Sequence, residues 1–568
     1  MLLQRRRWRI APPVTDGQAA RLPELPPLLV QMLYNRGVRG PEEATEFLAG
    51  RFRGGNPYRL AGVSRAVTHL RQAIRRGQRI AVYGDFDTDG VTATVLLVEV
   101  LSALGAQVEP YIPHRVDEGY GLKLEALRTL YQRGVRVVVT VDCGIRSYDE
   151  VEQASRGLTM IVTDHHSVGE RLPPAAAVIN PKQPDCPYPF KKLSGVGVAF
   201  KLAQGLLRAE GRTKGAVTLD EESLLDLVAL GTVADLVPLE GENRLLVRRG
   251  LEVLNESPRP GVEALMAEAG LRRGEVDATA IAFRLGPRLN AAGRIDSALL
   301  ACKLLTSREA LETRELAEEL GDLNRRRQEL TQQTVAQAEA QVLAADPEAR
   351  LYMAASPDFL PGIVGLAASR LTEAYYRPSV VVELGEQKSR GSCRSIPEFH
   401  ITQALEACGD LLTRFGGHEA AAGFTVDTKN LDELRQRLQA LAARRLAGVE
   451  LRPVLEIDAE LPLEKVSAET YHLLKRLKPC GVGNPQPVLL SRGVQVRDCR
   501  AVGGERKHLK LVLRDGRGVS WPAIGFHLGG LRAEVPARVD VAYHLKVNEW
   551  NHERRLQLVI QDLRPAEG

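Results

Sequence analysis

The feature that most constrains the fold is a repeated alternation between residues 79 and 166. Short apolar runs rich in β-branched residues (RIAVYGD, VEPYIP, VRVVVTVDCG and LTMIVTDHH) alternate with segments whose apolar residues recur every three to four positions. Strands alternating with amphipathic helices indicate an α/β fold, with a parallel sheet covered by helices on both faces. In such sheets, ligands bind at the edge formed by the carboxyl ends of the strands.

The most unusual polar residues follow three of these runs, on the predicted edge: Asp85, Asp87, Asp89, Asp142, Asp164, His165 and His166. Carboxylates held close together repel one another and raise one another's pKa, so the cluster predicts a bound cation. A mixture of carboxylates and imidazoles is harder than a thiolate site and softer than an all-oxygen calcium cage. Mn²⁺ or Mg²⁺ is therefore the expected ion.

A calcium-binding EF-hand is the first alternative, because GDFDTDG contains the D-x-D-x-D-G opening of its loop. However, the twelfth loop position is Leu96 instead of a bidentate glutamate, and the preceding RIAVYG is typical of a strand. A solvated turn with one capping aspartate would explain one carboxylate but not three. The residues favour a Mg²⁺ or transition-metal site at a strand-to-helix junction.

Another acidic residue, Asp235, lies in the mostly helical, apolar stretch ESLLDLVALGTVADLVPLE. It is either a helix cap or a further ligand of the same site. A site with this many donors is suited to two ions about 3.5–4 Å apart, which is how phosphoryl-cleaving enzymes activate water and stabilise the leaving oxygen.

Composition limits the classes of protein to which this chain can belong. The 568 residues carry a net charge of only +5, so any binding to nucleic acid must depend on local basic patches. Seven cysteines without a C-x-x-C pair argue against a disulfide framework or a zinc ribbon. No apolar run is long enough to span a bilayer, and no secretory signal is evident, so a cytoplasmic protein is expected.

The predicted organisation has five parts: an N-terminal helical segment (1–50), a catalytic α/β domain (51–305), a long connecting helix (306–345), a second α/β domain (346–450) and a connecting segment with a small β-barrel (451–568). The connecting helix begins at T-S-R-E, which resembles a capping box, and Gly321 is a candidate kink. About 38 residues would span roughly 57 Å, enough to bridge two domains.

The barrel is predicted from five short strand-like segments with turn signals after residue 490, a pattern typical of an OB fold. Trp521 and Trp550 lie among basic residues there. They are either stacking residues for single-stranded DNA or barrel-core residues, and the sequence supports both interpretations equally.

Several motifs resemble a known family. GDFDTDG, VDCG, TDHH and GTVADLVPL are similar to the four motifs of the DHH phosphoesterase superfamily. The segments GPRLNAAGRID, GSCRS, FGGHEAAAGF and GNPQP, with the terminal barrel, resemble the RecJ family of single-strand-specific DNA exonucleases, whose second domain is called DHHA1. The resemblance covers nearly the whole chain.

The resemblance implies a metal-dependent exonuclease that digests single-stranded DNA in the 5′→3′ direction, releasing mononucleotides in DNA repair and recombination. It implies Asp142, His165 and His166 as catalytic residues. The implied metal ligands are Asp85, Asp87, Asp89, Asp142, His165, His166 and Asp235. His166 would also contact the scissile phosphate. The pyrophosphatase branch of the superfamily has a histidine ligand where this chain has Tyr83, so one ion has fewer protein ligands.

The resemblance also implies a substrate-binding set: Arg115, Arg288, Asn290, Arg294, Ser392, Arg394, Gly417 and His418. Ser392 and Arg394 are two residues apart, so they face the same way on an extended segment and suit a terminal 5′-phosphate. The alternative is that Arg394 pairs with a carboxylate. The expected protein is a monomer that binds no membrane and works with a single-stranded-DNA-binding protein and a helicase.

Two rival functions remain. A phosphodiesterase for dinucleotides or cyclic dinucleotides would use the same core, but it needs neither the barrel nor the bridging helix. A non-catalytic scaffold of the same fold is disfavoured by the complete set of ligands.

Overall fold

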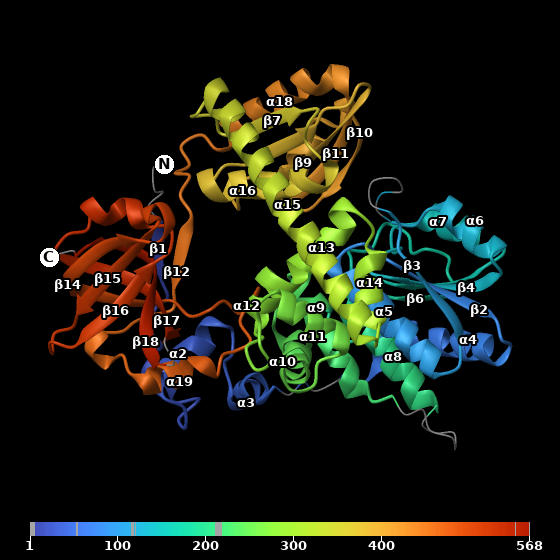
Figure 1. Cartoon of the computed structure of the whole chain (residues 1–568), viewed down its shortest axis with the longest axis horizontal. Helices are drawn as coiled ribbons and strands as arrows, with labels where there is room; N and C mark the ends of the chain where they lie inside the picture. Colours follow the sequence, from blue (N-terminus) through green and yellow to red (C-terminus); the bar gives the residue numbers. More distant parts are fainter. Residues whose placement is uncertain are drawn as a thin grey trace. The chain divides into compact units, whose positions relative to one another are not determined.

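The computed structural model describes residues 6–50, 52, 55–114, 119, 121–210, 219–550 and 553–566 (Figure 1). Its contacts divide the chain into two units. One unit holds residues up to 53, residues 238–248 and residues from 452 onward, and the other holds residues 54–237 and 249–451. Among the described residues, no helix is both long enough and apolar enough to cross a membrane.

The larger unit contains the predicted parallel sheet. Its strands are β2 (Arg79–Gly84), β3 (Gln107–Tyr111), β4 (Val135–Val141), β5 (Thr159–Thr163) and β6 (Ala177–Ile179). They are arranged in the order β3-β2-β4-β5-β6, and every pair is parallel. The carboxyl ends of all five strands therefore share one edge; the sequence predicts this for β2, β3, β4 and β5, and β6 is an addition.

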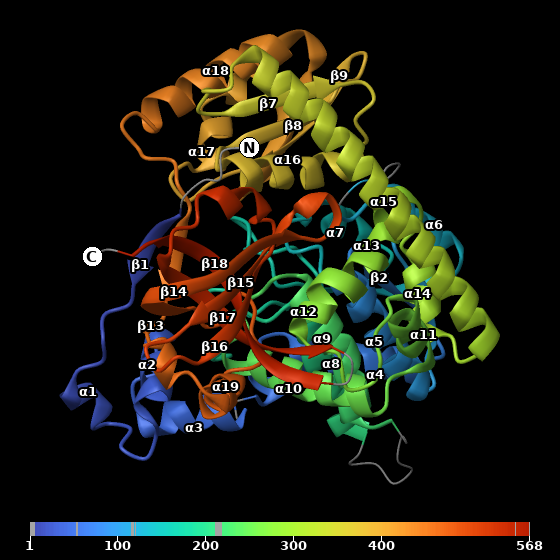
Figure 2. The same cartoon turned by 60° about the vertical axis from the view of Figure 1, so that its left-hand side comes forward.

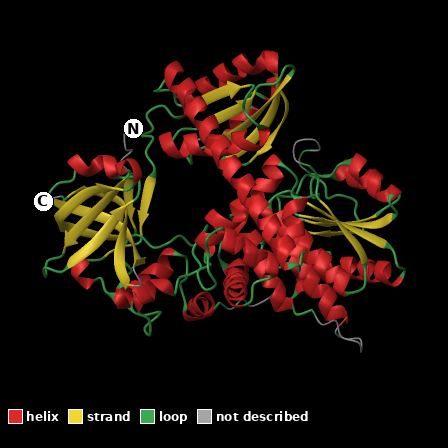
Figure 3. Cartoon of the chain, in the orientation of Figure 1, coloured by secondary structure: helices red, strands yellow, loops and turns green. Residues whose placement is uncertain are grey.

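Helices cover both faces of this sheet, as Figure 3 shows. On one face, α5 (Thr88–Ala103) packs against β2 and β3, and α8 (Gly195–Glu210) packs against β4 and β5. On the other face, α6 (Leu124–Gln132) and α7 (Tyr148–Ala154) share a hydrophobic core with the sheet. Helix α4 (Val63–Arg75) packs against β6.

A helical region follows the sheet. Its helices are α9 (Leu225–Ala234), α10 (Gly241–Glu256), α11 (Pro260–Glu268), α12 (Ala278–Ala280), α13 (Gly286–Ile295) and α14 (Leu299–Thr306), with a π-helix at Ile281–Leu285. Helix α9 packs against α5 and α8. A buried ion pair joins Arg259 to Asp226 on α9, with nitrogen–oxygen distances of 2.6 and 2.9 Å.

The long connecting helix is α15 (Ala310–Ala345), and the capping-box prediction for its start is wrong. Thr306 is the last residue of α14, and Glu309 is the N-cap of α15, without a side-chain capping bond. Gly321 lies within one unbroken helix. A Cβ there would lie 2.0 Å from Oε1 of Glu268, so the glycine gives α11 room to approach.

The second α/β domain has a sheet of five strands: β7 (Tyr352–Ser356), β8 (Ser379–Glu383), β9 (Lys388–Arg394), β10 (Leu412–Gly417) and β11 (Ala421–Asp427). Their order is β10-β11-β9-β8-β7, and only β7 and β8 pair in parallel. The sheet is accompanied by α16 (Pro361–Tyr375), α17 (Ile401–Glu406) and α18 (Leu431–Arg445). Helix α15 packs against α13 and α14 in its first part and against α16 and β7 in its last part.

The smaller unit contains a closed barrel of five strands: β14 (Leu489–Val502), β15 (His508–Arg514), β16 (Ser520–Gly525), β17 (Arg538–Trp550) and β18 (Glu553–Pro565). The order β14-β15-β16-β18-β17 closes because β14 also pairs with β17 (Figure 2). This confirms the predicted OB-type barrel. Its core is filled by inward leucine, valine and isoleucine side chains.

The N-terminal segment belongs to the same unit as the barrel. It contains α1 (Asp16–Ala19), α2 (Pro27–Asn35) and α3 (Pro41–Ala49), and α2 shares the barrel's hydrophobic core together with α19 (Ala468–Lys475). It also contains a strand that the sequence did not suggest, β1 (Arg7–Ile10), which pairs in parallel with β12 (Val454–Ile457). The short β13 (Ala459–Glu460) extends the sheet beside β14.

Gly231 lets α9 pack closely against α5 and α8. A Cβ at Gly231 would lie 2.3 Å from Oγ1 of Thr92 and 2.8 Å from Oδ1 of Asp89. Alanine usually stabilises a helix by about 1 kcal/mol relative to glycine. We expect Gly231→Ala instead to destabilise the fold by about 1–3 kcal/mol, because the added methyl group overpacks this contact.

Urea unfolding measures this change. Gly17→Ala on α1 is the control, because a Cβ at Gly17 meets nothing within 4 Å. Unchanged or increased stability of Gly231→Ala would contradict the prediction.

Candidate metal centre

The turn between β2 and α5 presents the first three carboxylates. Asp85 directly follows β2, Asp87 is the N-cap of α5, and Asp89 lies in the first turn of that helix. Oδ1 of Asp87 accepts a hydrogen bond of 3.0 Å from the backbone N–H of Gly90. A Cβ at Gly90 would lie 2.5 Å from the carbonyl oxygen of Asp85, so only glycine permits this tight turn.

The first residues of α8 hold Asp89 in place. The backbone N–H groups of Gly195 and Val196 donate hydrogen bonds of 2.6 and 2.8 Å to its two carboxylate oxygens. A Cβ at Gly195 would lie 2.7 Å from Oδ1 of Asp142, so this glycine lets the helix approach two carboxylates at once. Asp89 is 1% exposed and Asp142 is 2% exposed.

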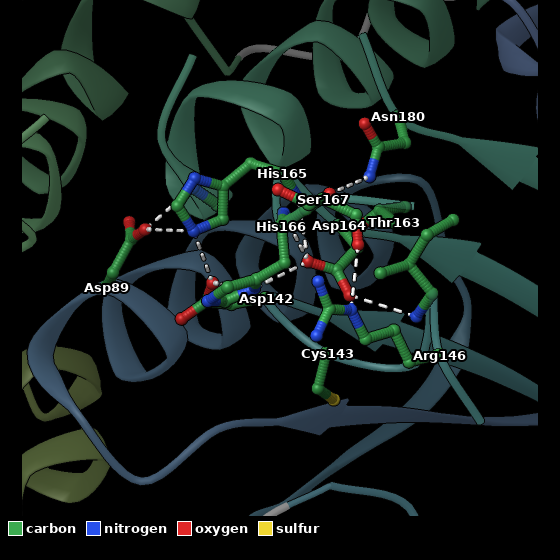
Figure 4. A network of polar contacts seen from close by, with 12 residues as sticks. Asp89, Asp142, Cys143, Arg146, Thr163, Asp164, His165, His166, Ser167 and Asn180 are labelled. Carbon is green, nitrogen blue, oxygen red and sulfur yellow. Dashed lines mark hydrogen bonds and ion pairs between the residues drawn. The ribbon is translucent and has the colours of Figure 1, made fainter. Parts of the chain in front are cut away.

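Asp142 follows β4 in the left-handed region, with φ of 61°. A non-glycine residue in this conformation costs roughly 1–3 kcal/mol and persists only where its surroundings fix it. The conformation places Oδ1 of Asp142 3.0 Å from Nε2 of His165 and 3.8 Å from Nδ1 of His166 (Figure 4). Asp142 therefore lies closer to His165 than Asp89 or Asp235 does, and it also lies near His166.

The two histidines converge because β5 ends at Thr163 and the chain turns, as the sequence interpretation requires. Asp164 stabilises the turn: its Oδ1 accepts hydrogen bonds from the backbone N–H groups of His165 (2.7 Å) and His166 (3.0 Å). The same oxygen lies 2.8 Å from Nδ1 of His166 (Figure 4). Asp164 thus orients His166, a role that its position before the histidine pair does not reveal.

The predicted ligands form three overlapping groups whose ligand atoms lie within 4.8 Å of one another. The groups are Asp142 with His165 and His166, Asp89 with His165 and Asp235, and Asp85 with Asp87 and Asp142. Asp142 and His165 each belong to two groups. The structure therefore brings together all seven residues that the sequence predicts as metal ligands, in an arrangement that suits more than one ion.

Burial makes this cluster unfavourable without a cation. Burial, reinforced by neighbouring carboxylates, raises the pKa of Asp89 to about 7, that of Asp235 to about 9 and that of Asp142 well above its ordinary value. Burial also lowers the pKa of His165 to about 3, so its imidazole is neutral, as a metal ligand must be.

Three buried ligand atoms make no hydrogen bond to any described residue: Oδ1 of Asp142, Nε2 of His165 and Oδ2 of Asp235. Nε2 of His165 lies 3.0 Å from the first oxygen and 3.6 Å from the second. Buried polar atoms are nearly always satisfied, so these atoms point to an ion. The donor set fits Mn²⁺ or Mg²⁺.

His166 differs from His165. Burial lowers its pKa, but the contact with Asp164 and the negative charge of that carboxylate outweigh burial, so the pKa of His166 is raised. Burial raises the pKa of Asp164, but the contact with His166 and backbone hydrogen bonds outweigh it and lower the pKa. In the ion-free protein the contact with Asp164 therefore favours the charged form of His166, whereas binding an ion through this ring would require the neutral form.

Two basic residues near the centre escaped the sequence analysis. Partial burial lowers the pKa of Lys182. The negative charges of Asp164 and Asp235 act in the opposite direction but do not outweigh burial. Nε of Arg146 donates a hydrogen bond of 2.9 Å to the carbonyl oxygen of Ser167, next to the histidine pair. In the sequence, the only signal for Lys182 is its position shortly after β6, and the only signal for Arg146 is its position shortly after β4. Basic residues are common at such surface positions, so neither residue stands out.

The predicted phosphate pocket lies mainly on β9 and at the end of β10. Arg394 donates hydrogen bonds to Oγ of Ser392 (3.3 Å) and to the carbonyl oxygen of Cys393 (2.8 Å). No carboxylate of the described residues forms an ion pair with Arg394. Burial lowers its pKa, as expected for a cation without a counter-ion.

His418 and Gly417 follow in the neighbouring strand and turn. Burial lowers the pKa of His418, and the positive charges of Arg146, His166 and Lys182 lower it further, which places its ring in the field of the metal centre. A Cβ at Gly417 would lie 2.3 Å from the carbonyl oxygen of Ala421, so glycine is required there.

The remaining predicted substrate residues have structural contacts. Arg288 forms an ion pair with Glu268, and Arg294 donates a hydrogen bond of 3.2 Å to the carbonyl oxygen of Gly362. Oδ1 of Asn290 accepts hydrogen bonds from the backbone N–H (2.8 Å) and Oγ1 (3.0 Å) of Thr88, so Asn290 supports the acidic turn.

Two predicted residues cannot be placed, and a third lies in the barrel. Arg115 and the side chain of Trp550 lie outside the described residues. Trp521 packs against the barrel core, and its Nε1 is buried.

Comparisons with known proteins agree with this geometry. Residues 79–232 match the DHH family N-terminal domain, residues 349–444 match the DHHA1 domain, and residues 457–562 match the RecJ OB domain. The chain is 37% identical over 575 residues to the single-stranded-DNA-specific exonuclease RecJ of Bacillus subtilis, covering 100% of this chain and 72% of that protein. It is 38% identical over 577 residues to the protein of the same name from Escherichia coli, covering 96% and 98%.

A solved structure extends the likeness to three dimensions. The crystal structure of RecJ from Thermus thermophilus in complex with Mn²⁺ has a TM-score of 0.84 and 34% identity, covering 99% of this chain and 80% of that chain. The Mg²⁺ complex from the same organism has a TM-score of 0.79 and 32% identity, covering 99% and 79%. With full-length relatives above 30% identity and matching domains in the same order, the chain belongs to the RecJ family.

Proposed function

We propose that this protein is a metal-dependent exonuclease that hydrolyses single-stranded DNA from the 5′ end, releases mononucleotides and acts in DNA repair and recombination in the cytoplasm. The observation that carries the proposal is the convergence of three carboxylate–imidazole groups on Asp142 and His165. The relatives named as single-stranded-DNA-specific exonucleases support it. Family membership is the only support for a single-stranded-DNA-binding protein and a helicase as partners.

The chemistry follows from the roles of the side chains. Two Mn²⁺ or Mg²⁺ ions would lower the pKa of a bound water and stabilise the charge on the phosphoryl oxygens. Asp142 would be shared between the two ion sites, because it belongs to two of the ligand groups. His166, oriented by its contact with Asp164, would contact a non-bridging oxygen of the scissile phosphate.

A pocket for the 5′-terminal phosphate completes the proposal. A terminal phosphate carries more negative charge than an internal one, and an arginine beside a hydroxyl recognises it well. Arg394 and Ser392 supply this pair on β9, and His418 links it electrostatically to the metal centre. The direction of digestion rests on family membership, because the geometry alone does not distinguish a 5′- from a 3′-phosphate.

The two rival functions fit less well. A phosphodiesterase of dinucleotides needs no barrel, whereas this chain has a complete one. A non-catalytic scaffold would have no reason to keep so many buried carboxylates together.

The first prediction concerns Asp142→Asn. The amide keeps the shape of the side chain and tolerates the left-handed backbone, but it removes one shared charge from both ion sites. We expect DNA hydrolysis with Mn²⁺ to fall by more than about 100-fold, since metal-site electrostatics are usually the largest catalytic contribution. The melting temperature of the ion-free protein should stay the same or rise, because a buried repulsive charge is lost.

End-labelled DNA strands and thermal melts measure these effects. Asp185→Asn, at an exposed position of the same domain, is the matched control. A folded Asp142→Asn variant with nearly normal activity would mean that Asp142 is not a metal ligand.

The second prediction concerns pH. Because the pKa values of Asp89 and Asp235 are raised in the ion-free protein, part of these carboxyls remains protonated near neutral pH. Ion binding requires carboxylates, so it should release protons. The apparent affinity for Mn²⁺ should therefore rise from about pH 6 to about pH 8.5. Titration calorimetry in buffers of different ionisation enthalpy counts the protons, and binding without proton release at all pH values would refute the prediction.

The third prediction concerns Arg394→Ala. Loss of a charge-assisted contact to a terminal phosphate should remove a preference of roughly tenfold or more for 5′-phosphate over 5′-hydroxyl strands. Metal-dependent cleavage should persist at a reduced rate. Arg390→Ala on the same strand is the control, because Arg390 is exposed. Strands labelled at the 3′ end measure the preference, and an unchanged preference in Arg394→Ala would remove Arg394 from the pocket.

A further inference from the structure

The acidic turn, residues 85–89, packs against one face of helix α13. Asn290 and Gly293 lie three residues apart on this helix and therefore share that face. Oδ1 of Asn290 accepts hydrogen bonds from the backbone N–H (2.8 Å) and Oγ1 (3.0 Å) of Thr88. A Cβ at Gly293 would lie 2.4 Å from the carbonyl oxygen of Phe86. Helix α13 thus contacts the backbone that carries the first metal ligands.

The last turn of α13 packs against the first turn of α16, again without an intervening side chain. A Cβ at Gly362 would lie 2.3 Å from the carbonyl oxygen of Arg294, and Gly362 is buried. The guanidinium group of Arg294 donates a hydrogen bond of 3.2 Å to the carbonyl oxygen of Gly362. Contacts between backbones cannot adjust by changing rotamers, so they fix the distance between the two helices.

One turn further along α16, Gly365 lies against the proposed phosphate pocket. A Cβ at Gly365 would lie 3.1 Å from Oγ of Ser392 and 3.3 Å from Nη2 of Arg394. Helix α16 also packs against β9, the strand that carries both residues. The helices α13, α15 and α16 each pack against the other two, which braces their arrangement. An unbroken series of close contacts therefore connects the acidic turn with the phosphate pocket.

We propose that α13 is a spacer that sets the length of the product, and that Gly362 is the specificity-determining residue at its contact with α16. An exonuclease that anchors a terminal phosphate cleaves the linkage that then lies at the metal centre. A rigid spacer therefore gives a product of one length, whereas a loose spacer gives products of mixed length. The inference rests on the proposed function, and it assigns a role in product specificity to a glycine outside both sites.

Gly362→Ala tests the spacer. The added methyl group would overlap the carbonyl oxygen of Arg294, so it must push α16 and the pocket away from α13. On 5′-phosphate strands, mononucleotide release with Mn²⁺ should slow by about 100-fold, because a displacement of about 1 Å can cost this much. The share of dinucleotide among the products should rise. On 5′-hydroxyl strands, which leave the pocket empty, the rate should be unchanged.

Two controls separate spacing from general damage. Gly409→Ala lies in the same domain, and a Cβ there would meet only the Phe415 ring, at an ordinary distance of 3.8 Å. Titration calorimetry should give Gly362→Ala the same affinity for Mn²⁺ as the wild type, since the metal centre is untouched. Equal slowing on 5′-phosphate and 5′-hydroxyl strands, or normal mononucleotide release by the folded variant, would overturn the proposal.

A blocked substrate tests the same claim on the wild-type protein, whether or not Gly362→Ala folds. Its first linkage is a methylphosphonate, which lacks a charged oxygen. With a 5′-phosphate, this strand should release no dinucleotide, because the spacer keeps the second linkage from the metal centre. With a 5′-hydroxyl, the same strand should be cut at its second linkage, because its end is not anchored.

Equal dinucleotide release from the two blocked strands would refute the spacer. Activity of the wild type on unblocked strands is measured alongside with Mn²⁺. If that activity is absent, the proposed function fails. If it is present while the two blocked strands behave alike, only this inference fails.

Discussion

Mutual repulsion among buried carboxylates is the interaction on which the rest of this structure depends. Asp89 and Asp142 are almost fully buried beside other acidic residues, and without a cation their ionised forms are unfavourable. The surrounding fold is built to hold them close nonetheless. Backbone amides of α8 bind Asp89, glycines at 90, 195 and 231 remove the side chains that would separate the elements, and Asp142 takes a left-handed backbone. Without ions, these carboxyls become partly protonated, and divalent ions make their ionised forms favourable.

The other parts of the chain supply what the metal centre lacks. Carboxylates and neutral imidazoles bind ions but do not select a strand end. In our account, Arg394 and Ser392 on β9 provide that selectivity. Neither site distinguishes a long strand from a short one. That function is proposed for the C-terminal barrel, which is of the OB type. Chemistry, end recognition and strand binding are thus assigned to separate domains, each with a different kind of side chain.

Sequence reasoning predicted the parallel sheet and the ligands because both depend on local patterns. Apolar runs define the strands, the carboxyl ends of parallel strands must share an edge, and so Asp142 and His165 had to lie together. Sequence reasoning failed where contacts between distant parts of the chain decide the local secondary structure. The T-S-R-E signal at Thr306 was overridden by the end of α14, and β1 forms only because β12, more than 400 residues later, pairs with it.

The most direct test of the central claim is a crystal structure with Mn²⁺, using anomalous scattering at the manganese edge to locate the ions. Our account predicts two ions about 3.5–4 Å apart, as in other two-metal sites, with the carboxylate of Asp142 bound to both. His165 should bind one of them through Nε2. A single ion, or ions that Asp142 does not contact, would contradict the account of how this site works.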